Sequence, residues 1–156
     1  MEEVIKLLKE KNKTISTMES CTGGFVANSI TNIEGSSEVF KFSAVTYSNE
    51  FKIKMGVSKD IIEKYSVYSI EVAKEMAKNI ALFTNSNYGI GITGKINRID
   101  KNNLRGLDNE VFVSVYELST NTYNNFKFKC EENCTRVQNK KLITDKIVEN
   151  LIKIIN

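Results

Sequence analysis

Histidine is absent from this sequence of 156 residues. The absence excludes a Ser-His-Asp triad, a Cys-His pair, an H-E-x-x-H zinc site and any imidazole general base. If the protein is a hydrolase, lysine, tyrosine or a carboxylate must therefore move the protons. Proline is absent as well, and together with the many lysine, asparagine and isoleucine residues this indicates a compositional bias of the source, from which no function follows.

Long apolar runs and a basic cluster are also missing. No stretch reaches the length of a membrane span, and the acidic start at Glu2 and Glu3 does not fit a signal peptide, so we expect a cytoplasmic protein. The net charge of +3 comes from 22 basic and 19 acidic residues spread along the chain. Without a clustered stripe there is no clear nucleic-acid signature. The length predicts one domain, residues 1–156, that folds without a disulfide or a metal.

Cysteine is scarce, and the spacings of Cys21, Cys130 and Cys134 fit no familiar zinc pattern. In a reducing compartment we expect three free thiols, with Cys130 and Cys134 as packing residues. Cys21, which stands beside Ser20, is itself a possible nucleophile. No histidine or arginine adjoins Cys21 in the sequence to stabilise a thiolate.

Helical and extended patterns alternate along the chain, which predicts an α/β fold. Helices are expected over 1–12, after the turn at Ser20, over 49–55, 58–65 and 69–83, and from Arg136 onward. Strands are expected over 14–18, 39–47 and 88–94, and in a hairpin of 111–118 and 122–129. The helix over 69–83 should bury Ile70, Val72, Ala73, Met76, Ala77, Ile80 and Leu82; the last helix should bury Leu142, Ile143, Ile147, Val148, Leu151, Ile154 and Ile155. This order implies a mixed sheet covered on both faces.

The stretch ESCTGGFVANSITN, residues 19–32, is predicted to be a strand end, a turn and a helix. Gly23 and Gly24 let the backbone turn tightly, so that the first N–H groups of the helix, which lack intrahelical partners, face the turn. A hydroxyl or an anion would sit well there. A simpler interpretation stays open, in which Ser20 or Thr22 caps the helix and the glycines make room for packing.

A second stretch, FSAVTYSNEFK over residues 42–52, is an apolar run that ends in tyrosine, asparagine and lysine. Polar side chains at the end of a strand often form a site. The two stretches together resemble the CinA C-terminal family, whose stand-alone members are nicotinamide-nucleotide amidohydrolases of the PncC type. The resemblance covers nearly the whole chain and also includes 34–37, 55–57, 92–94 and the helix from Arg136. It implies a three-layer α/β/α fold, like that of anticodon-binding domains, with a mixed sheet of about five strands.

The family resemblance implies hydrolysis of the carboxamide of nicotinamide mononucleotide to nicotinate mononucleotide and ammonia, with no metal and no cofactor. The nucleophile and the base of the family motifs fall on Ser20 and Lys52, and the motif tyrosine falls on Tyr47. The substrate-binding positions fall on Cys21, Thr22, Gly23, Gly24, Asn49, Thr93, Gly94 and Arg136. The expected partner is a small pyridine nucleotide, and no membrane partner is expected. A homo-oligomer such as a dimer stays open.

The chemistry requires Lys52 to be neutral part of the time, although an exposed ammonium has a pKa of roughly 10.4. Burial or a second cation would lower that pKa. Neutral Lys52 would take the Ser20 proton and return it to ammonia, and Tyr47 would relay or orient it. The candidates for an oxyanion hole are the backbone N–H groups of Cys21, Thr22, Gly23 and Gly24.

Each role has an alternative. In the alternative interpretation, Lys52 is a solvated helix lysine like its neighbour Lys54, and Tyr47 is a strand residue with its hydroxyl at the surface. Arg136, which matches the family arginine that would hold a phosphate, is otherwise part of a surface ion pair. A working amidohydrolase, a non-catalytic nucleotide-binding relative and an amidase for another small substrate all remain as hypotheses.

One segment departs from the family pattern. A glycine-rich run after T-G is replaced by the polar loop 95–109, so backbone contacts to the ligand should be lost and turnover of nicotinamide mononucleotide should be weak or absent. In an alternative outcome, Lys95, Arg98 and Lys101 grasp a phosphate, which shifts the position of the ligand rather than forbidding its binding. We also expect a mobile loop, because its only apolar anchors are Ile96, Ile99, Leu104 and Leu107.

Overall fold

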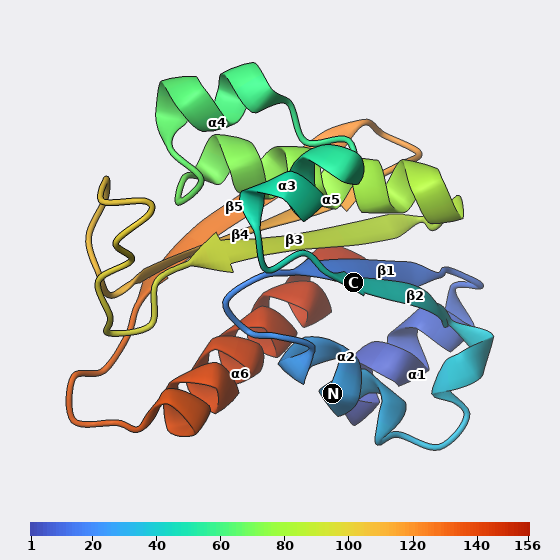
Figure 1. Cartoon of the computed structure of the whole chain (residues 1–156). Helices are drawn as coiled ribbons and strands as arrows, with labels where there is room; N and C mark the ends of the chain where they lie inside the picture. Colours follow the sequence, from blue (N-terminus) through green and yellow to red (C-terminus); the bar gives the residue numbers. More distant parts are fainter.

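A five-stranded mixed sheet lies between two layers of helices in the computed structural model, which describes residues 1–156 (Figure 1). The strands are β1 (Ile15–Glu19), β2 (Phe40–Val45), β3 (Tyr88–Gly94), β4 (Glu110–Glu117) and β5 (Thr122–Lys129), in the spatial order β2-β1-β3-β4-β5. β1 pairs in parallel with β2 and β3, whereas β4 pairs antiparallel with both β3 and β5. The expected α/β class, the mixed sheet and the hairpin are confirmed.

The helices cover both faces of the sheet. One face carries α3 (Asn49–Lys54), α4 (Lys59–Tyr65) and α5 (Ile70–Thr84); the other carries α1 (Glu2–Glu10), α2 (Phe25–Thr31) and α6 (Arg136–Ile155) (Figure 1). A short 3-10 helix, η1 (Ser36–Glu38), precedes β2. No helix has the length and apolar character needed to cross a membrane.

The apolar core is divided by the sheet. Leu8, Ile90 and Ile147 belong to the larger cluster beneath α1, α2 and α6. Under α5 the packing is close, because a Cβ added at Gly91 of β3 would lie 2.1 Å from the carbonyl oxygen of Ala73. β3 therefore needs glycine at this position for α5 to lie directly against the sheet.

Two residues expected in the core are exposed instead. Leu82 is 51% exposed and Leu142 is 43% exposed. Each lies next to a buried residue, Ala81 and Ile143 respectively, and one step along a helix turns a side chain by about 100° out of the buried stripe. The apolar pattern therefore overestimated the width of both buried faces.

The carboxyl ends of β1, β2 and β3 meet at one edge of the sheet. The chain runs from β1 to β2 on one side and then crosses to β3 on the other, so the strand order reverses around β1, which is where open α/β sheets bind ligands. Pairing continues beyond the strands, since Thr46 N–H donates to Glu19 O at 2.8 Å and Ser20 N–H donates to Ile92 O at 3.0 Å. Ser20 is thus held between β2 and β3.

Candidate active site

The turn after β1 is closed by the side chain of Glu19. Gly24 adopts a left-handed conformation with φ of 89°, and the fully buried Glu19 carboxylate accepts the N–H groups of Gly24, Val26 and Ala27 at 3.0, 3.2 and 2.8 Å. The expected tight turn is present. Neither Ser20 nor Thr22 caps α2, and the N-terminus of α2 has no room for an external anion, because the carboxylate already fills it.

Lys52 contacts Ser20 directly. α3 begins after Ser48, whose hydroxyl accepts the N–H of Phe51, and this start directs Lys52 inward. Its Nζ donates to Ser20 Oγ at 2.9 Å and to the Thr46 carbonyl oxygen at 2.7 Å, and Lys52 is only 1% exposed. The expected proximity is present, and the solvated-lysine alternative is wrong. The neighbouring Lys54 is the one at the surface, paired with Glu50.

Burial lowers the pKa of Lys52 from 10.5 to about 8, because the charged ammonium loses its hydration. The Asp100 carboxylate acts in the opposite direction and raises the pKa of Lys52. A substantial fraction of Lys52 is therefore neutral near pH 8. A neutral amine in contact with a hydroxyl is able to accept its proton, which is the arrangement that activates a serine.

Cys21 does not compete with Ser20 as a nucleophile at neutral pH. Burial raises the pKa of the Cys21 thiol to about 12, and the nearby Cys130 acts in the same direction. The thiolate, which is the reactive form, is then scarce. All three cysteines are free thiols, as expected; Cys130 is buried in the core, whereas Cys134 lines the cleft described next and is not a packing residue.

A cleft of about 930 Å³ opens above Ser20 and Lys52. Tyr47, Asn49, Gly94 and Arg136 line it, together with Cys21 and much of the loop 95–109. The sequence predicts eleven site residues in total.

 Seven of those eleven residues line the cleft itself: Ser20, Cys21, Tyr47, Asn49, Lys52, Gly94 and Arg136.

Arg136, the first residue of α6, joins two walls of the cleft. Its Nη1 donates to the carbonyl oxygen of Ile96 at 3.1 Å and its Nη2 donates to the Tyr47 hydroxyl at 3.4 Å. Arg136 forms no ion pair, so the surface-pair alternative is wrong, and its charge is directed at the cleft. Tyr47 is 67% exposed and makes no hydrogen bond to Ser20 or Lys52, so the expected proton relay has no direct path here.

Four predicted substrate-binding residues lie outside the cleft lining: Thr22, Gly23, Gly24 and Thr93. Thr93 is fully buried and its hydroxyl donates to the Val67 carbonyl at 2.9 Å, while the buried Thr22 hydroxyl has no partner. The N–H of Gly23 donates to Ser20 O at 3.0 Å, and that of Gly24 is bound by Glu19. Two of the four oxyanion candidates are thus occupied, and the N–H groups of Cys21 and Thr22 remain.

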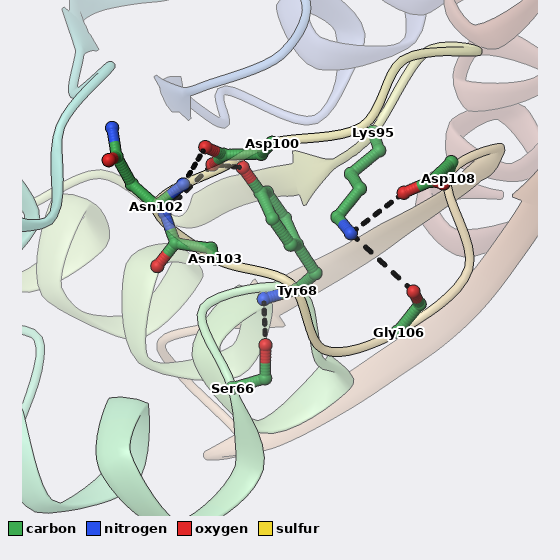
Figure 2. A network of polar contacts seen from close by, with 8 residues as sticks. All are labelled: Ser66, Tyr68, Lys95, Asp100, Asn102, Asn103, Gly106 and Asp108. Atoms are coloured by element: carbon green, nitrogen blue, oxygen red, sulfur yellow. Dashed lines mark hydrogen bonds and ion pairs between the residues drawn. The ribbon is translucent and has the colours of Figure 1, made fainter.

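The loop 95–109 borders the cleft, and polar contacts hold it in place (Figure 2). Lys95 is only 3% exposed, pairs with Asp108 at 2.9 Å and lies 5.2 Å from the ring centroid of Tyr68. Lys95 is therefore not free to grasp a phosphate, so that alternative is wrong for Lys95. Arg105 donates to the carbonyl oxygens of Glu63 and Lys64 at the end of α4, at 2.8 Å each.

Of the four apolar side chains expected to anchor this loop, only one is buried. Ile96 is buried in the core, whereas Ile99, Leu104 and Leu107 are exposed. The sequence interpretation also missed Tyr68 and Asp100, which line the cleft and are joined by a hydrogen bond from the Tyr68 hydroxyl to the carboxylate. An acidic residue in a loop expected to border the pocket was the one signal that pointed to Asp100.

The sequence matches the family model described as the CinA C-terminal domain over residues 1–144. It is 53% identical over 96 residues to a competence-damage inducible protein of Clostridium perfringens, covering 60% of this chain and 23% of that protein. A competence-damage inducible protein of Clostridium beijerinckii is 44% identical over 140 residues, covering 88% of this chain and 34% of the relative. The chain therefore spans about a quarter to a third of the length of these curated relatives.

Solved structures share the fold at low sequence identity. A CinA superfamily protein of Klebsiella pneumoniae superposes with a TM-score of 0.90 at 17% identity, covering 99% of this chain and 94% of that one. A competence/damage-inducible protein of Agrobacterium tumefaciens has a TM-score of 0.84 at 22% identity, covering 99% and 96%. From its match to the family model over most of its length, we conclude that this chain belongs to the CinA C-terminal domain family.

Proposed function

We propose that this protein hydrolyses the carboxamide of nicotinamide mononucleotide, with Ser20 as nucleophile and Lys52 as general base. The observation that carries the proposal is the 2.9 Å contact between Ser20 Oγ and the buried ammonium of Lys52 at the floor of the cleft. The lowered pKa of Lys52, about 8, supports its role as a base. In a chain without histidine, this is the contact that supplies a hydroxyl with a proton acceptor.

The proposed reaction has two steps. Neutral Lys52 takes the Ser20 proton as Oγ attacks the carboxamide carbon, and the developing oxyanion is bound by the free N–H groups of Cys21 and Thr22. When the C–N bond breaks, Lys52 returns the proton to the nitrogen and ammonia leaves. Neutral Lys52 then takes a proton from water as the water oxygen attacks the ester carbon, and it returns that proton to Ser20 Oγ as the ester bond breaks and nicotinate mononucleotide leaves.

Arg136 is the proposed phosphate ligand. Its guanidinium lines the cleft without a carboxylate partner, and it begins the 20-residue helix α6, whose N-terminus carries partial positive charge. If Arg136 binds the phosphate of nicotinamide mononucleotide, the nicotinamide ring at the other end of the molecule would extend toward Ser20.

The loop 95–109 favours a second candidate, an amidase that turns over nicotinamide mononucleotide weakly or prefers another small amide. Side chains of Arg98, Asp100 and Asn102 line the cleft where relatives are expected to present glycine backbone. These side chains occupy space, and a displacement of about 1 Å can reduce a rate roughly 100-fold.

Ammonia release tests the proposal. Wild type, Ser20→Ala, Lys52→Met and the matched control Lys54→Met are assayed with nicotinamide mononucleotide and a panel of small amides. Ser20→Ala and Lys52→Met should each lose at least about 1,000-fold, because members of one dyad act as a unit. Lys54, on the same helix but at the surface, should change activity less than about twofold.

Two results would refute the proposal. Full activity in Ser20→Ala would show that Ser20 is not the nucleophile. If folded wild type released no ammonia from any amide, the hypothesis of a non-catalytic nucleotide-binding relative would remain. Turnover of another amide alone would favour the second candidate. Circular dichroism on each variant establishes that a lost activity is not a lost fold.

A further inference from the structure

Tyr68 and Asp100 form a pair in the cleft that the proposed mechanism does not use. Tyr68 lies between α4 and α5, and Asp100 lies in the loop 95–109, yet both line the same cleft as Ser20 and Lys52. The Tyr68 hydroxyl donates to Asp100 Oδ2, and Figure 2 shows the ring directed at the carboxylate.

The Asp100 carboxylate is fixed and charged. Besides Tyr68, Oδ2 accepts Asn103 Nδ2 at 2.8 Å, and Oδ1 accepts the backbone N–H of Asn102 at 2.9 Å (Figure 2). These hydrogen bonds hold its pKa below the ordinary value, the one from Tyr68 contributing most, so the group is ionised at neutral pH. A carboxylate has about four acceptor positions, and three are filled.

Asp100 takes part in no ion pair. The charge of Lys95, which lies over the Tyr68 ring, contributes to the lowered pKa of Asp100, but the ammonium of Lys95 is bonded to Asp108 at 2.9 Å and not to Asp100. The negative charge of Asp100 also reaches the catalytic end of the cleft, because it raises the pKa of Lys52. A ligand whose amide contacts Ser20 therefore lies within the field of this carboxylate.

We infer that Tyr68 and Asp100 form a subsite for a cationic heteroaromatic ring, so that the cleft selects amide substrates whose ring carries a positive charge. The inference rests on the proposed function and specifies its substrate class. An aromatic ring and a carboxylate both attract a cation. A ring quaternised at nitrogen has no N–H donor, so charge and contact with an aromatic side chain are what remain to recognise it.

Equilibrium binding to the Ser20→Ala protein tests the subsite without turnover. The probes are nicotinamide mononucleotide, with a pyridinium ring, and its reduced dihydro form, which has a neutral ring and the same phosphate. Adding Asp100→Asn should weaken binding of the cationic form by roughly 5- to 10-fold and of the neutral form by less than about twofold, as expected for loss of one partly solvated charge contact. Tyr68→Leu, which removes the ring, should also reduce the preference.

Glu132→Gln is the matched control, because Glu132 is another carboxylate that lines the cleft and it makes no hydrogen bond to Tyr68. It should leave the ratio of the two affinities unchanged. The subsite is refuted if Asp100→Asn leaves that ratio unchanged, or if Glu132→Gln lowers it equally.

The two proposals fail separately. If Asp100→Asn removes the preference for the cationic form but the wild-type protein releases no ammonia, the subsite is retained and the amidase proposal is refuted. If the wild-type protein releases ammonia but Asp100→Asn leaves the ratio of the two affinities unchanged, the amidase proposal is retained and the subsite is refuted. If neither mononucleotide binds, 1-methylnicotinamide and neutral nicotinamide are compared by ligand-observed NMR, and equal binding or no binding of both refutes the subsite.

Discussion

The Glu19 carboxylate reaches over the turn that follows its own strand and accepts the N–H of Ala27, eight residues later, at 2.8 Å. Its second oxygen accepts the N–H groups of Gly24 and Val26. A negative charge at this end of α2 is favourable. Because Ser20 is covalently attached to Glu19, the position of the proposed nucleophile depends on a residue that is fully buried.

Glu19→Ala should lower the free energy of unfolding by roughly 2–4 kcal/mol, since three buried donors lose a charged acceptor. Glu19→Gln keeps one oxygen as an acceptor and should lose less. Urea unfolding measures both, with Glu38→Gln, in a largely exposed pair with Lys9, as the control. A Glu19→Ala protein as stable as the control would show that the cap is dispensable.

The rate should rise with pH. Because Lys52 must be deprotonated to act as a base and its pKa is about 8, kcat/KM should increase through pH 8 and level off above it. Removing the Asp100 charge with Asp100→Asn should lower the pKa of Lys52 and shift the midpoint toward acid, because the carboxylate raises that pKa. A rate that falls above pH 7, or a midpoint that moves toward base, would contradict a lysine base.

Stability should also depend on the protonation of Lys52. The folded-state pKa of Lys52, about 8, lies below its ordinary value of 10.5, so between these two values the unfolded chain binds more protons than the folded one. Stability therefore rises with pH across this window and is lost as pH falls through 8. The free energy of unfolding of wild type, relative to that of Lys52→Met, should rise by up to about 1.4 kcal/mol per pH unit across this window. Urea unfolding at intervals of pH measures this difference. A constant difference would mean that the pKa is not lowered.

The ion pair between Lys95 and Asp108 should matter to the loop. The Lys95 side chain is 2% exposed and that of Asp108 is 44% exposed, so Asp108→Asn leaves a buried cation unpaired and should destabilise the protein by roughly 1–3 kcal/mol. Lys95→Met with Asp108→Asn should recover most of this loss, because the unpaired charge is gone. A double-mutant cycle measures the coupling, and additive effects would show that the pair contributes nothing.

Local patterns predicted the elements, because strand ends and helix periods are visible in the sequence. The Ser20–Lys52 contact was predicted from the resemblance to the CinA C-terminal family, and the absence of histidine agreed with a lysine base. The sequence patterns did not predict which hydrogen-bonding groups already have a partner within the protein. The Glu19 cap depends on the left-handed turn at Gly24, and the burial of Thr93 depends on the Val67 carbonyl it reaches.

The contacts of the loop depend on long-range packing. Tyr68 and Asp100 are 32 residues apart, and no local pattern pairs them. Charged residues in a loop predict exposure, yet Lys95 is buried because Asp108 and the Tyr68 ring surround its ammonium.

Acyl transfer to Ser20 is tested most directly by rapid acid quenching of wild type during turnover of nicotinamide mononucleotide, followed by proteolysis and tandem mass spectrometry. The predicted result is an ester of the nicotinate mononucleotide acyl group on Ser20, absent from Ser20→Ala, which also releases no ammonia. An acyl group on Cys21, or ammonia release from Ser20→Ala at the wild-type rate, would contradict the assignment of Ser20 as the nucleophile.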